Sequence, residues 1–289
     1  KDFKNALHNF SIALDISKKL HYIFEQGVNY ERIGNCYIEL EDYSKAIENH
    51  FASLKVSEKL DDIKGVGDSY SDIAAIYLGM NDYPKSLSNY VNALKMYKIF
   101  GNFEYIANGY RDVGIINQKF HKSTLALSYL DSALVIYQKE KMDYMLASTF
   151  SLKSDIYLEI HDLERATSMI EMEIKVCRNN NFLDFLKDAY KKMALLKADR
   201  NDYKSAYYYH VLYAQIKDSF INSGEETTES ITALQAKFDK EKIEQEKLLH
   251  EAIIAQKESK LKQEQTQRYA LYGGLCIMLI FGGFIFNRF

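Results

Sequence analysis

The chain has 289 residues, of which 47% are hydrophobic and 27% charged, with a formal net charge of -3 at pH 7. This composition is too apolar for a disordered chain, and a single proline with 13 glycines argues against an all-β fold rich in tight turns. The slightly negative charge gives no sign of the basic surface that nonspecific nucleic-acid binding requires. A mostly helical protein is therefore expected.

Catalytic and metal-binding motifs are absent from the sequence. It contains no phosphate-binding loop, no dinucleotide-binding glycine pattern, no zinc-protease motif and no serine-hydrolase elbow. The three cysteines, Cys36, Cys177 and Cys276, stand far apart and have no histidine at ligand spacing, so they predict neither a zinc site nor a disulfide framework. We therefore assign no catalytic, cofactor-binding or metal-binding residue, and we expect these 289 residues not to form an enzyme.

A 40-residue repeat runs through the first 222 residues. One set of positions carries a mostly large residue, a small residue three positions later and a mostly large one four positions after that, which places all three on one helix face. The small residues of this set are Ala6, Ala46, Ser86, Ala126, Ala166 and Ala206.

A second set of positions has the same period and predicts a second helix in each repeat. An aromatic residue is followed four positions later by a small one in Tyr30 and Gly34, Tyr70 and Ala74, Tyr110 and Gly114, Phe150 and Ser154, and Tyr190 and Ala194. A small residue beside an aromatic ring lets two helix backbones approach closely. Each repeat is therefore expected to be a pair of packed helices.

These residues resemble the tetratricopeptide repeat. The family pattern of apolar, small and aromatic positions over two helices is matched most fully by Tyr70, Ile73, Ala74, Tyr77, Ser86, Tyr90 and Ala93. The sequence departs from the family in having no tryptophan, no proline at the end of each second helix, and a period of 40 residues instead of about 34. The resemblance covers residues 1–222, a half repeat followed by five repeats, and implies a right-handed α-solenoid. We expect the six additional residues in a longer second helix and a longer loop after it.

The resemblance also implies a concave groove, lined mainly by the first helices, that binds a protein or peptide. By the family pattern the groove-lining residues include Glu31, Asn35, Ser71, Arg111, Asp155 and Lys191. This set has no single charge, and Glu31 stands where a two-carboxylate clamp would need lysine. Ordinary solvation of these polar side chains is the alternative interpretation.

After Ser223-Gly224 the pattern changes, and residues 223–268 form a separate charged segment. Residues 225–268 contain ten acidic and eight basic residues and neither proline nor glycine, which predicts one long helix. Heptad spacing suggests a dimeric coiled coil, and hence a homodimer, with a seam of Ile231, Leu234, Phe238, Leu248, Ala252 and Ala255. Polar residues interrupt the seam, so a single solvated helix remains the alternative.

Residues 269–286 contain no charged side chain over 18 positions. As a helix they would span about 27 Å, close to the hydrocarbon thickness of a bilayer. We expect a single transmembrane helix, with residues 287–289 as a short remaining tail; a buried core helix is the alternative. The positive charges on the two sides do not decide the orientation.

The order of repeat array, charged helix and membrane span resembles the input half of bacterial membrane signalling proteins, such as sensor histidine kinases with tetratricopeptide repeats. That resemblance implies a bacterial inner-membrane protein whose array is periplasmic and whose output domain is absent from this chain, since no kinase motif is present. The alternative is a tail-anchored scaffold with cytosolic repeats and no output domain.

Overall fold

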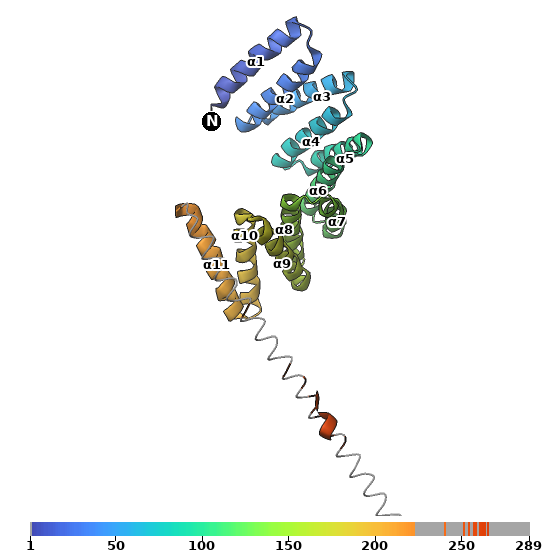
Figure 1. The fold of residues 1–289 in the computed structure, drawn as a ribbon. Helices are drawn as coiled ribbons and strands as arrows, with labels where there is room; N and C mark the ends of the chain where they lie inside the picture. The colour runs from blue at the N-terminus through green and yellow to red at the C-terminus, as the bar shows by residue number, and fades with distance from the viewer. Residues whose placement is uncertain are drawn as a thin grey trace, which may run out of the picture. The chain divides into compact units, whose positions relative to one another are not determined.

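The computed structural model describes residues 2–222 continuously and isolated positions between 240 and 265. Residues 2–222 contain helices and turns but no strand, which confirms the predicted all-α class (Figure 1). The helices are α1 (Phe3–Lys19), α2 (Ile23–Glu39), α3 (Tyr43–Lys59), α4 (Ile63–Gly79), α5 (Tyr83–Phe100), α6 (Phe103–Lys119), α7 (Ser123–Lys139), α8 (Asp143–Glu159), α9 (Leu163–Asn180), α10 (Leu183–Asp199) and α11 (Tyr203–Asn222). The chain divides into two compact units, residues 1–214 and 215–289, and the stack of helices belongs to the first.

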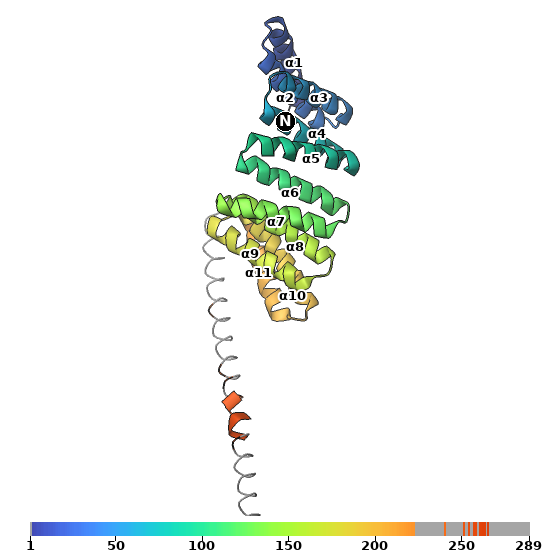
Figure 2. The same ribbon diagram turned by 90° about the vertical axis from the view of Figure 1, so that its right-hand side faces the viewer.

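The helices stack in chain order, each packed on the one before and the one after it. The most extensive packing joins α2 to α3, α4 to α5, α6 to α7 and α8 to α9, which are the predicted helix pairs. Figure 2 shows α5, α6 and α7 as successive layers of this stack. The two predicted sets of positions therefore mark the first and second helices of real repeats.

The turns between the helices of residues 2–222 are closely similar, and nine of the ten close with the same type of backbone hydrogen bond. Each contains a residue with positive φ, and these residues recur every 20 positions, at His21, Glu41, Asp61, Asn81, Gly101, His121, Lys141, His161, Asn181 and Asn201. Only one of them is glycine. After Glu41 the backbone N–H of Asp42 donates to the Tyr37 carbonyl oxygen at 2.9 Å, which satisfies a carbonyl that the helix end leaves open.

The six additional residues of each repeat lengthen helices and not loops, so our expectation of a longer loop was wrong. The loop from α3 to α4 spans residues 60–62, as short as the loop from α2 to α3 at residues 40–42. Both α3 and the following first helix, α4, have 17 residues. The additional residues therefore enlarge the contact between helices and do not lengthen the loops.

Aspartates that recur with the 40-residue period begin the second helices. Asp42, Asp82 and Asp162 each accept a hydrogen bond from the backbone N–H three residues later, as N-caps do. The single proline, Pro84, lies in the first turn of α5, where no helical hydrogen bond is lost. Helix starts are thus encoded locally in most repeats.

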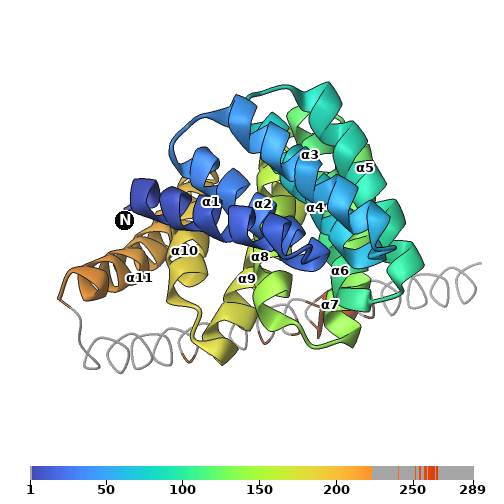
Figure 3. The same cartoon turned by 90° about the horizontal axis from the view of Figure 1, so that it is seen from above.

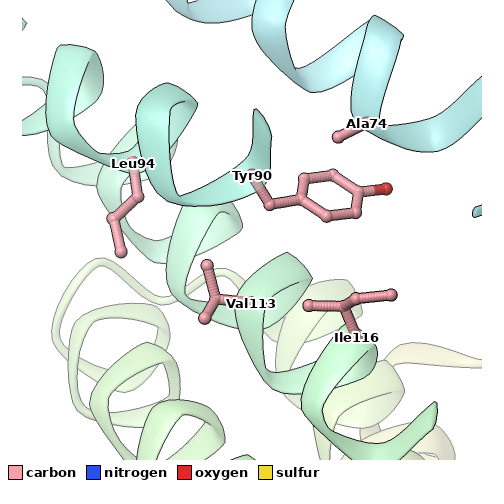
Figure 4. Close-up of a cluster of buried hydrophobic side chains, with 5 residues drawn as sticks. All are labelled: Ala74, Tyr90, Leu94, Val113 and Ile116. Atoms are coloured by element: carbon pink, nitrogen blue, oxygen red, sulfur yellow. The ribbon is translucent and has the colours of Figure 1, made fainter. Parts of the chain in front are cut away.

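The core lies between neighbouring helices along the whole stack. In one cluster the ring of Tyr90 on α5 extends between Ala74 of α4 and Ile116 of α6, with Leu94 and Val113 beside it (Figure 4). All five of these side chains are buried. The small residue under the aromatic one is thus where the two helices of a repeat meet, and the same cluster reaches the first helix of the next repeat.

The first helices α2, α4, α6, α8 and α10 lie along the inner side of the curved stack, and α3, α5, α7 and α9 lie along its outer side (Figure 1). Seen from above, the helix direction turns progressively from one repeat to the next (Figure 3). The inner row brings corresponding positions of successive first helices onto one face.

The predictions for residues beyond 222 fall almost wholly outside the described residues. The isolated positions described between 240 and 265 are helical, as the charged-helix prediction requires. The coiled-coil seam residues and the span at 269–286 are not among them. Within the part of the chain that the structure describes, no helix has an apolar stretch long enough to cross a membrane.

Candidate functional site

All six residues predicted to line the groove lie on first helices of the inner row. Glu31, Asn35 and Lys191 are exposed, whereas Ser71, Arg111 and Asp155 are half-buried. They stand on α2 (Glu31 and Asn35), α4 (Ser71), α6 (Arg111), α8 (Asp155) and α10 (Lys191). No described hydrogen bond or ion pair joins any two of the six, so the structure aligns them without forming a single cluster.

Three carboxylates of α2 and α4 influence one another at one end of the row. Burial, and then the carboxylates of Glu31 and Asp68, raise the pKa of Asp72 to about 7. The Nδ1 atom of His50, which is fully buried on α3, lies 3.4 Å from the Asp72 carboxylate. Burial lowers the pKa of His50 to about 4, so its ring is neutral at pH 7. This end of the row is acidic.

Asp68 is held by two donors. The hydroxyl of Tyr97 on α5 donates to Oδ1 at 3.0 Å, and the Lys64 ammonium donates to Oδ2 at 2.6 Å. Burial raises the pKa of Tyr97, and the nearby Ser71 hydroxyl opposes that rise. Ser71 therefore borders a polar network that joins α4 to α5.

Arg111 lies at the middle of the row, on α6. Its Nη1 atom is 3.2 Å from the Met145 sulfur on α8, and its Nη2 atom is 3.4 Å from Asp112 Oδ1. Burial raises the pKa of the Asp112 carboxyl, and the guanidinium beside it opposes that rise. Arg111 thus spans two neighbouring first helices.

A second polar cluster surrounds Lys192 on α10. Its ammonium donates to the Asp155 carboxylate at 2.6 Å, to the Ser151 hydroxyl at 2.9 Å and to the Ser154 hydroxyl at 3.2 Å. Beneath this cluster lies Glu173 of α9, which is fully buried. Burial raises the pKa of Glu173 to about 7, against the nearby Lys192 and Ser151.

Sequence reasoning missed two buried charges in the fourth repeat. Lys153, whose ammonium pairs with Asp131, occupies the position that holds Ile33, Ile73 and Val113 in earlier repeats. Glu173 occupies the position that holds Ser53, Ala93 and Ala133. The detectable signal was a charged residue that breaks the 40-residue register at a core position.

An apolar hollow of about 460 Å³ lies between α10 and α11. Lys191 lines it, together with the exposed side chains of Leu195, Tyr203 and Tyr207. These two tyrosines therefore lie outside the core. The hollow carries little polar surface for chemistry.

No metal site is found among the residues described, because no three His, Cys, Asp or Glu side chains there are placed to share an ion. Cys36 and Cys177 are buried, and burial raises the pKa of the Cys177 thiol to about 12. Neither thiol is therefore suited to nucleophilic chemistry. Cys276 lies outside the described residues.

Comparison with known proteins identifies the fold. No protein-family model matches the sequence, and no curated protein matches it. The fold is similar to BtubC (BKLC) from P. vanneervenii, with 18% identity, a TM-score of 0.68, and coverage of 76% of this chain and 92% of that one.

Two further solved structures are similar. A Rap protein complexed with Competence and Sporulation Factor has 15% identity, a TM-score of 0.51, and coverage of 77% of this chain and 73% of that one. A signal transduction ATPase with a tetratricopeptide repeat sensor, from Pyrococcus horikoshii, has 16% identity, a TM-score of 0.54, and coverage of 80% and 39%. Such identities support the fold alone. Residues 2–214 form a solenoid of helical repeats like the tetratricopeptide repeat.

Proposed function

We propose that residues 1–222 bind a protein or peptide along the inner row of first helices. The observation that carries this proposal is the alignment of half-buried polar groups there, at Ser71, Arg111 and Asp155. Partly desolvated polar groups discriminate between ligands more strongly than fully hydrated ones. The row is acidic near Glu31 and Asp72 and carries two lysines on α10. It therefore favours a ligand with basic groups facing the acidic end and acidic groups facing the lysines.

The similar solved structures support a binding role on this fold. One is a Rap protein in complex with a factor, and another carries its repeats as a sensor. Solenoids of this kind offer extended surfaces rather than enclosed reaction sites. We therefore propose a protein-interaction module that senses its ligand, and no catalytic role for these residues.

Photo-crosslinking tests where the ligand binds. A photoreactive amino acid at Asn35, exposed on α2, should crosslink a protein or peptide partner in cells. The matched control places it at Val135, which is exposed on the second helix α7. The charge reversal Arg111→Glu should reduce the crosslink at Asn35. Equal crosslinking from Val135, or no effect of Arg111→Glu, would contradict binding on the inner row.

We further propose that the array is the input region of a membrane-bound bacterial signalling protein, of the kind that ends in a histidine kinase. The support is the order of the sequence: repeats, a charged helix at 225–268, and an uncharged stretch at 269–286 that would anchor the chain. In this proposal the array is periplasmic, and the charged helix passes a change in the array to the membrane through dimer geometry.

Cysteine labelling of the full chain in cells tests this topology. Lys141→Cys places a thiol in the exposed turn between α7 and α8, while Cys36 and Cys177 are buried and should give little background. A membrane-impermeant maleimide should label intact cells. Labelling only after permeabilisation would contradict a periplasmic array and favour the tail-anchored scaffold. Release from the membrane on deletion of residues 269–286 serves as the control for anchoring.

A further inference from the structure

A pocket of about 150 Å³ lies between α2, α3 and α4, entirely within the repeat array. Val28, Ser57 and Leu60 line it together with the carboxylates of Glu31 and Asp68. Leu60 is 41% exposed, and Phe24, also at the pocket, is 60% exposed, so the pocket opens to solvent. A space of about 150 Å³ is large enough to hold a benzene ring.

The pocket exists because this joint lacks two tyrosines. At the next joint of the stack, Tyr97 on α5 and Tyr105 on α6 pack with ring centroids 5.3 Å apart. The residues at the same positions one repeat earlier are Ser57 and Gly65. A Cβ atom on Gly65 would lie 2.6 Å from the Ser57 hydroxyl oxygen and closer still to the Asp62 carboxylate, so Ser57 and Gly65 are in contact at the wall of the pocket.

The two joints that follow show how a tyrosine sits at this position. Tyr97 donates its hydroxyl to Asp68 at 3.0 Å, and Tyr137, one repeat further on, donates to Asn108 at 2.7 Å. Each acceptor lies on the first helix of the same repeat. The equivalent position on α2 is Val28, which cannot accept, but Glu31 lies one helical turn further along and lines the pocket.

We propose that this pocket binds the side chain of a tyrosine carried by a protein or peptide ligand. The ring takes the place that Tyr97 fills in the next repeat, and its hydroxyl donates to Glu31. No described side chain donates a hydrogen bond to Glu31, so the acceptor is open. The proposal rests on the proposed interaction function and adds to it the side chain that the array selects.

The charges at the pocket favour an unmodified tyrosine. Glu31, Asp62 and Asp68 contribute three carboxylates, and the single ammonium, Lys64, already donates to Asp68 and lies 4.9 Å from the centre of the Tyr105 ring. A phosphate on the ligand ring would meet net negative charge in a partly enclosed site. Phosphorylation of the ligand tyrosine should therefore prevent binding.

The probe for this pocket is p-cresol, the tyrosine side chain itself, titrated into the full chain by calorimetry. We expect saturable binding that is at least tenfold weaker in Ser57→Tyr, which fills the pocket with the missing ring. The matched control, Ser44→Tyr, adds the same ring at an exposed position of α3 and should bind p-cresol as the original chain does. p-Tolyl phosphate should bind at least tenfold more weakly than p-cresol.

A second variant keeps the test decisive if Ser57→Tyr does not fold. Glu31→Met removes the acceptor and should abolish the preference for p-cresol over toluene while leaving toluene binding unchanged. Absence of saturable p-cresol binding, or equal binding to Ser57→Tyr in its folded form, overturns the proposal. Because no protein partner takes part, failure here leaves the crosslinking test of the inner row unaffected.

Discussion

Glu173 shows what a single residue can do to the energetics of a repeat. It is fully buried where other repeats carry serine or alanine, and its pKa is raised from an ordinary value of 4.5 to about 7. The folded state therefore keeps a proton that the unfolded chain releases near pH 4.5. Its contribution to stability is complete below pH 4.5 and is lost as the pH rises to about 7.

Glu173→Gln should remove the loss of stability that ionisation of Glu173 causes as the pH rises. A shift of this size corresponds to about 3 kcal/mol, so the stability of the variant relative to the original chain should rise by about that amount between pH 4 and pH 8. Chemical denaturation of both proteins at several pH values measures the difference in their free energies of unfolding. The shifted pKa values of Asp72 and His50 also make stability depend on pH, in opposite directions, but both proteins contain these residues, so their effects cancel in the difference. A difference that is flat with pH would show that Glu173 is ionised in the folded state.

At the scale of the helix, a close contact between the first and second helices determines how each repeat packs. A Cβ atom on Gly114 of α6 would lie 2.9 Å from the Leu130 side chain on α7 and 3.3 Å from the Ala126 carbonyl oxygen. The small residue at this position thus allows the two backbones their close approach. The same position carries Gly34, Ala74 and Ser154 in other repeats.

Gly114→Leu should therefore destabilise the array by about 1–3 kcal/mol or more through overpacking, lowering the melting temperature by several degrees. Gly79→Ala is the control, since a Cβ atom there meets nothing within 4 Å. Circular dichroism melting of both variants makes the comparison. A melting temperature of Gly114→Leu equal to that of the control would mean that the contact can widen freely.

Much of this helical arrangement could be predicted from the sequence, because contacts between adjacent helices repeat and leave a periodic signal. The pairing of helices follows from that signal, whereas the placement of Arg111 and Asp155 in a groove was only what the family resemblance implies. The pocket at Ser57 and Gly65 does not follow from that signal, because it arises from two side chains that are missing. The ion pair of Lys192 with Asp155 also depends on which rotamers fit between helices, and no periodicity encodes that choice.

In the molecule as a whole, each repeat contacts mainly its neighbours, so stability is distributed along the stack and local weaknesses stay local. The fourth repeat, α8 and α9, buries Lys153 and Glu173 where earlier repeats bury apolar or small residues. Burial of charge is unfavourable even when the group is paired. The fourth repeat should therefore open more readily than the second.

Hydrogen exchange at pH 7 should show faster exchange of backbone amides in α8 and α9 than in α4 and α5. Lys153→Met, which introduces the residue found at Met193 in the fifth repeat, should slow exchange in α8 and α9 and stabilise the array by about 1 kcal/mol or more. Its former partner Asp131 has a side chain that is 58% exposed and remains hydrated. Equal protection of the two repeats, or faster exchange in Lys153→Met, would contradict this distribution of stability.

The similarity of the turns affects how a folding chain selects which helices become the first and which the second helices of each repeat. The turns recur every 20 residues, whereas the packing pattern recurs every 40, so a first helix and a second helix are joined by the same kind of bend on either side. A folding chain that exchanged the roles of the two helices would keep the turns unchanged, except the one at Gly101, after which the next helix begins from a different backbone conformation. Residues such as Gly114 and Tyr90, which recur only every 40 positions, distinguish the correct arrangement from the slipped one. Substitutions there should therefore affect which helices pair as well as how stable the array is.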